Sequence, residues 1–241
     1  MGKKIKVQRR GRGGSVFRAA KMHKIAPSKY PSLSEENLNG TITELFHESG
    51  RQVPLAYIEF QPGQGFYSSA IEGAYINKQI TVGPEASAQV GNILPIGRVP
   101  EGSMVCNIEL RPGDGGKMAR ASGSFGTVIA HTPTHTSIRL PSRRTVTIPN
   151  NSRVTIGIIS GGGRKEKPFM KAGGKLNAKK AKGHKYPVAH GVKMPAAMHP
   201  HGGGRHRRPG KSTTVSRHAP PGAKVGLIAA RNSGKRKRRR N

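Results

Sequence analysis

Positive charge in this chain of 241 residues is concentrated at its two ends. Residues 1–24 contain nine Lys or Arg and no acid, and residues 161–241 contain 23 basic residues and one acid, Glu166. Residues 25–160 are almost neutral, with eleven basic and ten acidic residues. Because like charges repel when a chain is compacted, neither end is expected to form a packed interior of its own in water.

A polyanion removes that repulsion, because Lys and Arg side chains replace the counterions condensed on it. We therefore predict nucleic acid as the main partner. A solvated, disordered tail is the plainer alternative, but the excess of charge in residues 161–241 is larger than solubility requires. An anionic membrane surface is a second alternative; it needs a helix with a continuous apolar face, and Gly and Pro interrupt this region too often.

The composition excludes several other classes of protein. Only 33% of residues are hydrophobic and 5% aromatic, so one large core spanning the whole chain is excluded. No stretch approaches 18 consecutive apolar residues, and the charged N-terminus lacks the apolar region of a secretory signal. Cys106 is the single cysteine, which excludes an internal disulfide and fits a reducing, intracellular compartment. We expect no membrane association and no homo-oligomer.

Short apolar segments separated by turn residues fill the middle of the chain. Alternation with period two at Ile138/Leu140, Val146/Ile148 and Val154/Ile156/Ile158 is typical of half-buried strands. We predict a mainly β fold with two small antiparallel barrels, since closure removes exposed strand edges. A single sandwich is the alternative. The strands are expected at residues 41–46, 55–60, 66–71, 79–82, 94–99, 104–110, 124–131, 135–140, 143–148 and 154–158.

The predicted organisation has four parts: a basic extension at 1–24, a first barrel at 25–90, a second barrel at 91–160 and a basic extension at 161–241. The strand pattern ends at residues 161–163, three consecutive glycines. A short basic helix is expected within residues 165–182, broken by Gly173 and Gly174, and one helical turn near residues 16–22. Six prolines between Pro187 and Pro221 forbid a long helix, so extended chain shaped by the partner is expected.

A glycine-rich segment, Pro112–Lys117, lies between two predicted strands. Glycines allow backbone N–H groups to approach phosphates, and Arg111, Lys117 and Arg120 would add charge. The segment is not a Walker loop, because the G-x-x-x-x-G-K-[ST] pattern is absent. Taken alone, an ordinary glycine-rich turn is the favoured interpretation.

A second segment, Met198–Arg208, has two histidines flanking a proline and then three glycines. Its glycines permit close backbone approach, and its imidazoles can stack on bases or bond to phosphate. A metal site is one alternative, but no cysteine and almost no carboxylate lies nearby. Acid–base catalysis by His199 or His201 is another, but no partner residue is evident. The tract Lys235–Arg240 is a localisation signal or a phosphate-binding tail.

Six segments occur in order along the chain: Gly13–Arg18, Gly91–Pro95, Pro112–Gly123, Gly191–Met194, Met198–Gly204 and Gly222–Arg231. Taken together, they closely resemble the ribosomal large-subunit protein two family, universal RNA-binding proteins near the peptidyl-transferase centre. Arg205-His206-Arg207 and residues 216–220 resemble the archaeal and eukaryotic branch, and His201 favours an archaeal form. The resemblance covers nearly the whole chain.

The resemblance implies an OB-like barrel followed by an SH3-like barrel, with extensions threading into large-subunit rRNA. It implies a cytoplasmic structural protein of the large subunit, not an enzyme, which supports the peptidyl-transferase region, subunit association and tRNA binding. A direct catalytic role of His199 and His201 has been suggested for the family and is disputed; a DNA-coating architectural protein is a further alternative.

The implied partners are large-subunit rRNA, neighbouring large-subunit proteins and the small subunit. We expect no cofactor, and a structural Mg²⁺ at the RNA interface stays open. The residues expected to bind rRNA are basic, glycine and histidine positions: Arg9, Arg10, Arg12, Arg18, Arg111, Lys117, Arg120, Lys193, His199, His201, Gly202, Gly203, Gly204, Arg205, Arg207, Arg208, Lys211, Arg217, Lys224 and Arg231.

Overall fold

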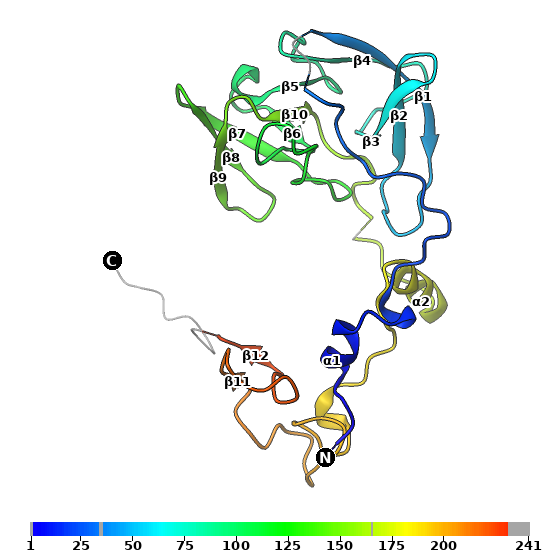
Figure 1. Cartoon of the computed structure of the whole chain (residues 1–241), viewed down its shortest axis with the longest axis vertical. Coiled ribbons are helices and arrows are strands. Elements are labelled where there is room, and N and C mark those ends of the chain that lie inside the picture. The colour runs from blue at the N-terminus through cyan, green and yellow to red at the C-terminus, as the bar shows by residue number, and fades with distance from the viewer. Residues whose placement is uncertain (1, 34–35, 165, 231–241) are drawn as a thin grey trace. The chain divides into compact units, whose positions relative to one another are not determined.

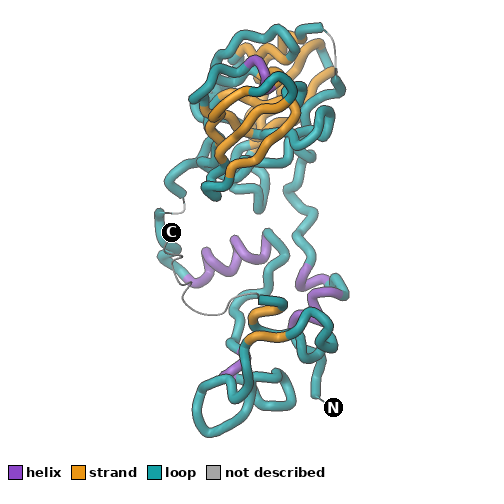
Figure 2. The backbone as a smooth tube through the Cα atoms, turned by 90° about the vertical axis from the view of Figure 1, so that its left-hand side faces the viewer, coloured by secondary structure: helices purple, strands orange, loops and turns teal. Residues whose placement is uncertain are grey.

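The structure is a computed structural model that describes residues 2–33, 36–164 and 166–230. The chain forms two units. Unit 1 combines both ends of the chain, residues 1–20 and 171–241, and unit 2 contains residues 21–170. Ten of the strands belong to unit 2, whereas the described part of unit 1 consists mostly of loops (Figures 1 and 2).

Unit 2 contains one hydrogen-bonded sheet in the order β3-β2-β1-β4-β5-β10-β6-β7-β8-β9. All neighbouring strands run antiparallel except β4 and β5, which meet in parallel at Val82 and Ile93. The 3₁₀ helix η2 (Ile96–Arg98) follows β5. The strands are β1 (Leu38–Phe46), β2 (Leu55–Gln61), β3 (Gln64–Ser69), β4 (Gln79–Val82), β5 (Ile93–Pro95), β6 (Met104–Cys106), β7 (Gly126–His131), β8 (His135–Arg139), β9 (Thr145–Pro149) and β10 (Arg153–Ile156).

Two apolar clusters fill the interior of unit 2. The first packs residues of β1 to β4 with Tyr30 and Ile93, and the second packs residues of β5 to β10 with Ala86 and Val99. A small third cluster contains Val53, Ile71, Cys106 and Ile159. Along the sequence, the change from the first cluster to the second lies near the predicted boundary at residue 90. The four predicted domain ranges themselves stay predictions.

The prediction of a mainly β fold is confirmed, and each predicted strand segment overlaps an observed one. The pattern at Val154 and Ile156 predicts a half-buried strand. A strand is present, but the prediction that it is only half-buried is wrong. All four residues of β10 are buried, because β10 lies between β5 and β6 within the sheet. The polar residues of β10 alternate with its apolar ones but are buried as well, because each has a partner: Arg153 pairs with Glu109 at 2.9 Å, and the Thr155 hydroxyl lies 2.6 Å from the Tyr30 hydroxyl.

Unit 1 has few regular elements and almost no apolar interior. Among its described residues, only the apolar side chains of Ile5 and Val225 are buried, with 5% and 6% exposure. Its elements are α1 (Lys6–Gly11), η1 (Ser15–Phe17), α2 (Ala172–Ala181), η3 (Gly191–Lys193), β11 (Thr214–Val215) and β12 (Leu227–Ile228).

The helices differ in detail from the expectation. Gly173 and Gly174 do not break the basic helix but lie in the first turn of α2, where most backbone N–H groups have no partner within the helix in any case. The helical turn expected near residues 16–22 is the 3₁₀ helix η1, and α1 was not predicted.

The two ends of the chain contact one another within unit 1. The backbone N–H of Lys3 donates to the carbonyl of Ala197 at 3.0 Å. Gly183, which follows α2 with φ +67°, packs so closely on the backbone of residues 17–19 that a Cβ atom there would lie 2.6 Å from the Ala19 nitrogen. The short strands β11 and β12 pair in parallel. The N-terminal extension is therefore part of the same structure as the C-terminal one.

Candidate nucleic-acid interface

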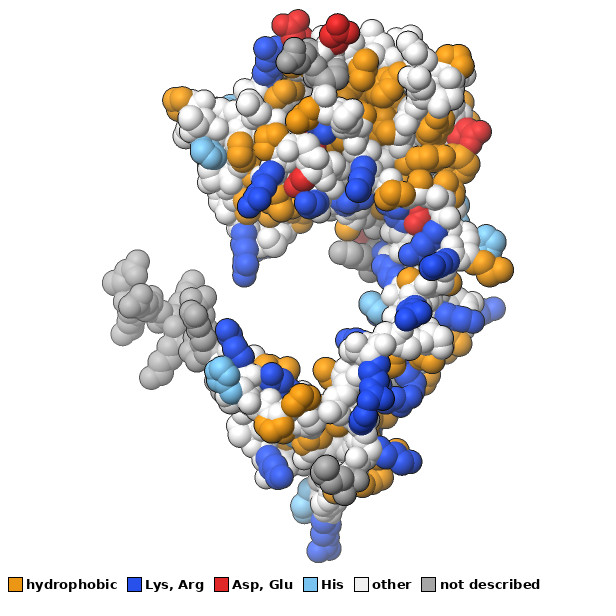
Figure 3. Space-filling view, viewed as in Figure 1, with side chains coloured by type: hydrophobic (Ala, Val, Ile, Leu, Met, Phe, Trp, Pro, Cys, Tyr) orange, Lys and Arg blue, Asp and Glu red, His pale blue; other side chains and the backbone are white. Residues whose placement is uncertain are grey.

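The charges of the two units differ in kind. Residues 1–20 and 171–241 contain 27 Lys or Arg and no Asp or Glu, so no acidic side chain within unit 1 neutralises them. The acidic side chains visible in Figure 3 belong to unit 2. Within the described residues, each of the ion pairs Arg51–Glu48, Arg98–Glu85, Lys117–Asp114 and Arg153–Glu109 also lies in unit 2. Unit 1 is therefore the part of the molecule best suited to a polyanion.

Most of the predicted basic contacts are exposed in unit 1. Lys193, at the end of η3, is also exposed, whereas Lys224 is half-buried. Arg231 and the tract Lys235–Arg240 lie outside the described residues. The other predicted basic contacts in the described part of unit 1 are all exposed: Arg9, Arg10, Arg12, Arg18, Arg205, Arg207, Arg208, Lys211 and Arg217.

Like charges crowd the N-terminal segment. Burial, then the neighbouring charges of Arg10 and Lys185, lower the pKa of Lys6. An anion placed among these groups would relieve their repulsion.

The histidine segment has a defined internal geometry. The backbone N–H of His201 donates to Nδ1 of His199 at 3.0 Å, so a neutral His199 carries its proton on Nε2. The two rings are tilted, with centroids 5.3 Å apart. Burial and the neighbouring His201 lower the pKa of His199, so the neutral form predominates at neutral pH. His199 therefore offers one N–H donor and a ring face.

The three glycines of this segment serve two purposes. Gly202 lies against the carbonyls of Met194 and Pro195, where a side chain would not fit. Gly203 and Gly204 both have φ +81°, a conformation that glycine adopts at no steric cost, and both are exposed. Internal packing therefore explains Gly202. The N–H of Gly203 donates to the Met194 carbonyl at 2.9 Å, so of these three glycines Gly204 is the one best placed to approach a partner.

In unit 2 the glycine-rich loop is held by carboxylates of the protein itself. Glu109, which is fully buried, accepts hydrogen bonds from the N–H groups of Gly113 at 3.3 Å and Gly115 at 2.9 Å. Asp114 accepts from the N–H of Gly116 at 3.2 Å. These N–H groups are thus not free to bind phosphate, which favours the interpretation of the segment as an ordinary turn.

The three cations predicted beside this loop have different surroundings. Arg111 is exposed, and the Lys117 side chain is 58% exposed with its Nζ 3.4 Å from Asp114. Arg120 is half-buried, and its guanidinium donates to the carbonyls of Gly116 at 3.0 Å and Ser28 at 2.8 Å. Burial, then Arg51, lowers the pKa of Arg120. Arg120 joins the loop to the segment before β1, and its contact with phosphate stays a prediction.

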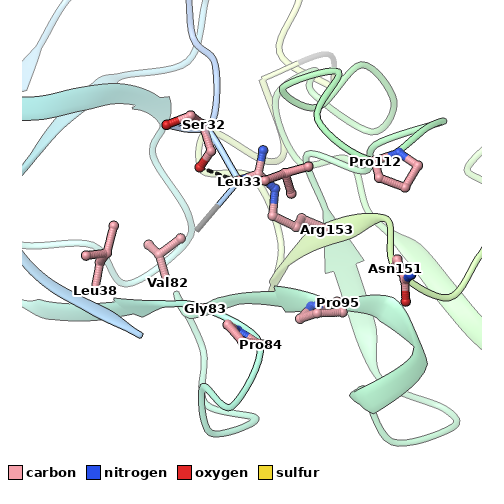
Figure 4. Close-up of a pocket in the computed structure, with 10 residues that line it drawn as sticks. All are labelled: Ser32, Leu33, Leu38, Val82, Gly83, Pro84, Pro95, Pro112, Asn151 and Arg153. Atoms are coloured by element: carbon pink, nitrogen blue, oxygen red, sulfur yellow. Dashed lines mark hydrogen bonds between the residues drawn. The ribbon is translucent and has the colours of Figure 1, made fainter. Parts of the chain in front are cut away.

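An apolar depression of about 420 Å³ in unit 2 has Arg153 on one side (Figure 4). The Arg153 guanidinium already donates to Glu109 at 2.9 Å and to the carbonyl of Ser32 at 3.3 Å. Leu33, Leu38, Val82 and three prolines provide most of the remaining wall. With its one cation paired, this depression is not a phosphate site.

No group of three His, Cys, Asp or Glu residues able to hold a metal ion occurs among the described residues. Within the same described residues, no helix has the length and apolar character needed to span a bilayer.

Sequence reasoning did not single out Lys3 and Lys4. They line a pocket together with residues 196–200, which include His199. Both lysines belong to the basic N-terminal segment. The sequence of such a segment does not indicate which of its residues contact a segment almost 200 residues away. The close contact of Gly2 with Ala197 brings them there.

Comparison with known proteins gives consistent matches. Residues 89–223 match the family model described as Ribosomal Proteins L2, C-terminal domain. The chain is 50% identical over 240 residues to large ribosomal subunit protein uL2 of Korarchaeum cryptofilum, covering 99% of this chain and 98% of that protein. It is 50% identical to the protein of the same name from Hyperthermus butylicus, over 99% and 100% of the two chains. For Cenarchaeum symbiosum the identity is 45%, over 98% of each.

Proposed function

The chain belongs to the uL2 family of large ribosomal subunit proteins, in its archaeal form, and from this premise we propose that it is a structural constituent of the large subunit that binds rRNA mainly through unit 1. The observation that carries the proposal is the charge of unit 1, which has 27 Lys or Arg and no acidic residue. Folding cannot neutralise this charge from within, whereas phosphates can.

The binding mechanism follows from the sparse interior of unit 1. Its backbone is ordered by local hydrogen bonds and by pairing of the two ends, with few apolar contacts to hold it. When unit 1 binds rRNA, counterions are released. The free energy gained by this release offsets the entropy that the chain loses when it becomes ordered. Lys and Arg then position the chain, and the shape of the RNA provides most of the specificity.

The finer role rests on the family. We propose that the protein acts in the cytoplasm within the large subunit, beside neighbouring large-subunit proteins, and that it supports the peptidyl-transferase region, subunit association and tRNA binding. A structural Mg²⁺ between protein and RNA phosphates is part of this proposal. Oxygen ligands from the RNA would hold such an ion, since carboxylates are absent from unit 1.

Direct catalysis by His199 receives no support from its geometry. A general base needs a free nitrogen lone pair, but in neutral His199 the Nδ1 lone pair accepts the N–H of His201 and Nε2 carries the proton. No acidic side chain of unit 1 is available to orient or charge the ring. We therefore assign the segment to RNA binding.

The test compares the full chain with a shortened chain of residues 21–170, which is unit 2 without either part of unit 1. Binding to large-subunit rRNA is measured against salt concentration. For the full chain we expect the logarithm of the association constant to fall linearly with the logarithm of the salt concentration. The slope should be about −0.9 for each phosphate contacted, which gives about −9 for about ten contacts. The shortened chain should lose most of this slope and at least about 10³ in affinity at low salt.

Undiminished rRNA binding by the shortened chain would show that unit 1 is not the main interface. Duplex DNA of matched length is the control ligand. Equal affinity of the full chain for duplex DNA and rRNA would favour the DNA-coating alternative instead.

A further inference from the structure

A pocket of about 410 Å³ lies within unit 1, where the two ends of the chain meet. Residues 2–5 and Gln8 line it from the N-terminal end, and residues 196–200 with Gly222 line it from the C-terminal end. The volume is in the range of roughly 300–1,000 Å³ that holds small organic groups. A single phosphate ion would leave most of it empty.

The pocket is built by specific contacts. Lys3 donates its backbone N–H to Ala197, and Gly2 lies so close to the Ala197 carbonyl that no larger residue fits. Ile5 is one of two buried apolar side chains in the described part of unit 1, and its N–H donates to Oε1 of Gln8 at 3.0 Å. These contacts place the N-terminal wall opposite the histidine segment.

The chemistry of the lining is of two kinds. Ile5, Ala196, Ala197, Met198 and Pro200 make the walls largely apolar. Lys3 and Lys4 are exposed cations on the same pocket, with no carboxylate in unit 1 to pair with them. An apolar interior beside unneutralised lysines suits a ligand with a flat, weakly polar part and a negative part.

A nucleotide has this combination. Unpaired bases of RNA are commonly recognised by stacking on aromatic side chains, including histidine, while cations bind the adjoining phosphates. His199 lines the pocket and has a ring held in place by the N–H of His201.

We propose that this pocket holds one unstacked nucleotide of the large-subunit rRNA, with the base between the apolar walls and His199, and the phosphates at Lys3 and Lys4. The proposal rests on the proposed function, because it names the part of rRNA that one site in unit 1 takes. It also gives the first residues of the chain a direct role in recognising RNA.

The main test fills the pocket in the full-length chain. Ala196→Trp places a large side chain in the wall, and Ala189→Trp, at an exposed alanine outside the pocket, is the matched control. In complexes with large-subunit rRNA, base-specific chemical probing should show one nucleotide that the wild type protects and that becomes reactive with Ala196→Trp. Affinity should fall roughly 5- to 100-fold, the range expected for losing one stacked base. Ala189→Trp should match the wild type.

A second measurement does not depend on a bulky substitution. Photo-methionine incorporated in the full chain should crosslink from position 198 to one rRNA nucleotide, the same one that the probing identifies. Unchanged protection and affinity with Ala196→Trp, or no crosslink from position 198 to rRNA, would overturn the pocket assignment while rRNA binding still stands. A wild-type chain that protects no rRNA would instead contradict the proposed function itself.

Discussion

At the scale of single residues, Glu109 shows how an acidic side chain supports a protein built to bind anions. Its two oxygens accept hydrogen bonds from the backbone of Gly113, Gly115 and Arg153, and from the Arg153 guanidinium. The side chains of Glu109 and Arg153 are 0% and 7% exposed, so this ion pair is shielded from water. Glu109 therefore fixes the backbone of the glycine-rich loop from the buried side, while the cations Arg111 and Lys117 are exposed.

We predict that Glu109→Gln lowers the free energy of unfolding of the chain by about 3–5 kcal/mol, because it leaves Arg153 buried without its counter-charge. Denaturation in urea, followed by circular dichroism, measures the change. Glu85→Gln is the matched control, since its pair with Arg98 spans 4.0 Å and both side chains are more than half exposed. That control should change stability by about 0–1 kcal/mol. Equal effects of the two substitutions would show that Glu109 has no special structural role.

At the scale of elements, the sequence predicts strands better than it predicts helices. Strands such as β4 at Gln79–Val82 have the predicted limits; here Gly83 and Pro84 follow directly and leave little choice of where the strand ends. The helix α2 begins seven residues later than the predicted segment and includes Gly173. Glycine lowers helix stability by about 1 kcal/mol without forbidding a helix, so composition alone did not determine its limits.

The two glycines at the ends of α2 are expected to respond in opposite ways to alanine. Gly173→Ala should stabilise α2 by about 0.4–1 kcal/mol, because its Cβ meets nothing within 4 Å and the unfolded chain loses freedom. Gly183→Ala should destabilise it by more, because φ is +67° and the Cβ would press on the backbone of residues 17–19. Amide hydrogen exchange in residues 175–181 measures both. Faster exchange in Gly173→Ala, or no change in Gly183→Ala, would contradict this account of the helix ends.

At the scale of the whole molecule, apolar burial and positive charge are separated between the two units. Unit 2 contains all three apolar clusters, whereas the described part of unit 1 buries Ile5 and Val225 alone among its apolar side chains. Burial of apolar surface provides most of the driving force for folding. Unit 2 thus has the means to fold without a partner, and unit 1 needs rRNA to become firmly ordered.

This difference predicts an uneven response to protease. In the RNA-free chain, trypsin should cut residues 171–230 well before it cuts residues 36–164, with unit 2 persisting as a stable fragment. Addition of large-subunit rRNA should protect the C-terminal residues in the same digestion. Mass spectrometry of timed samples identifies the fragments. If residues 171–230 survived as long as unit 2 without RNA, unit 1 would be a stable fold in its own right.

The charge of the two ends, the mainly β middle and the absence of a large interior at the ends all follow from the order of residues. These properties depend on neighbours in the sequence and on totals, which a sequence displays directly. The pairing of Glu109 with Arg153, the bond from Arg120 to the Ser28 carbonyl and the pocket between Lys3 and His199 depend instead on residues about 40 to almost 200 positions apart. Only the folded chain brings such residues together, because each contact needs the backbones that carry it to be placed first.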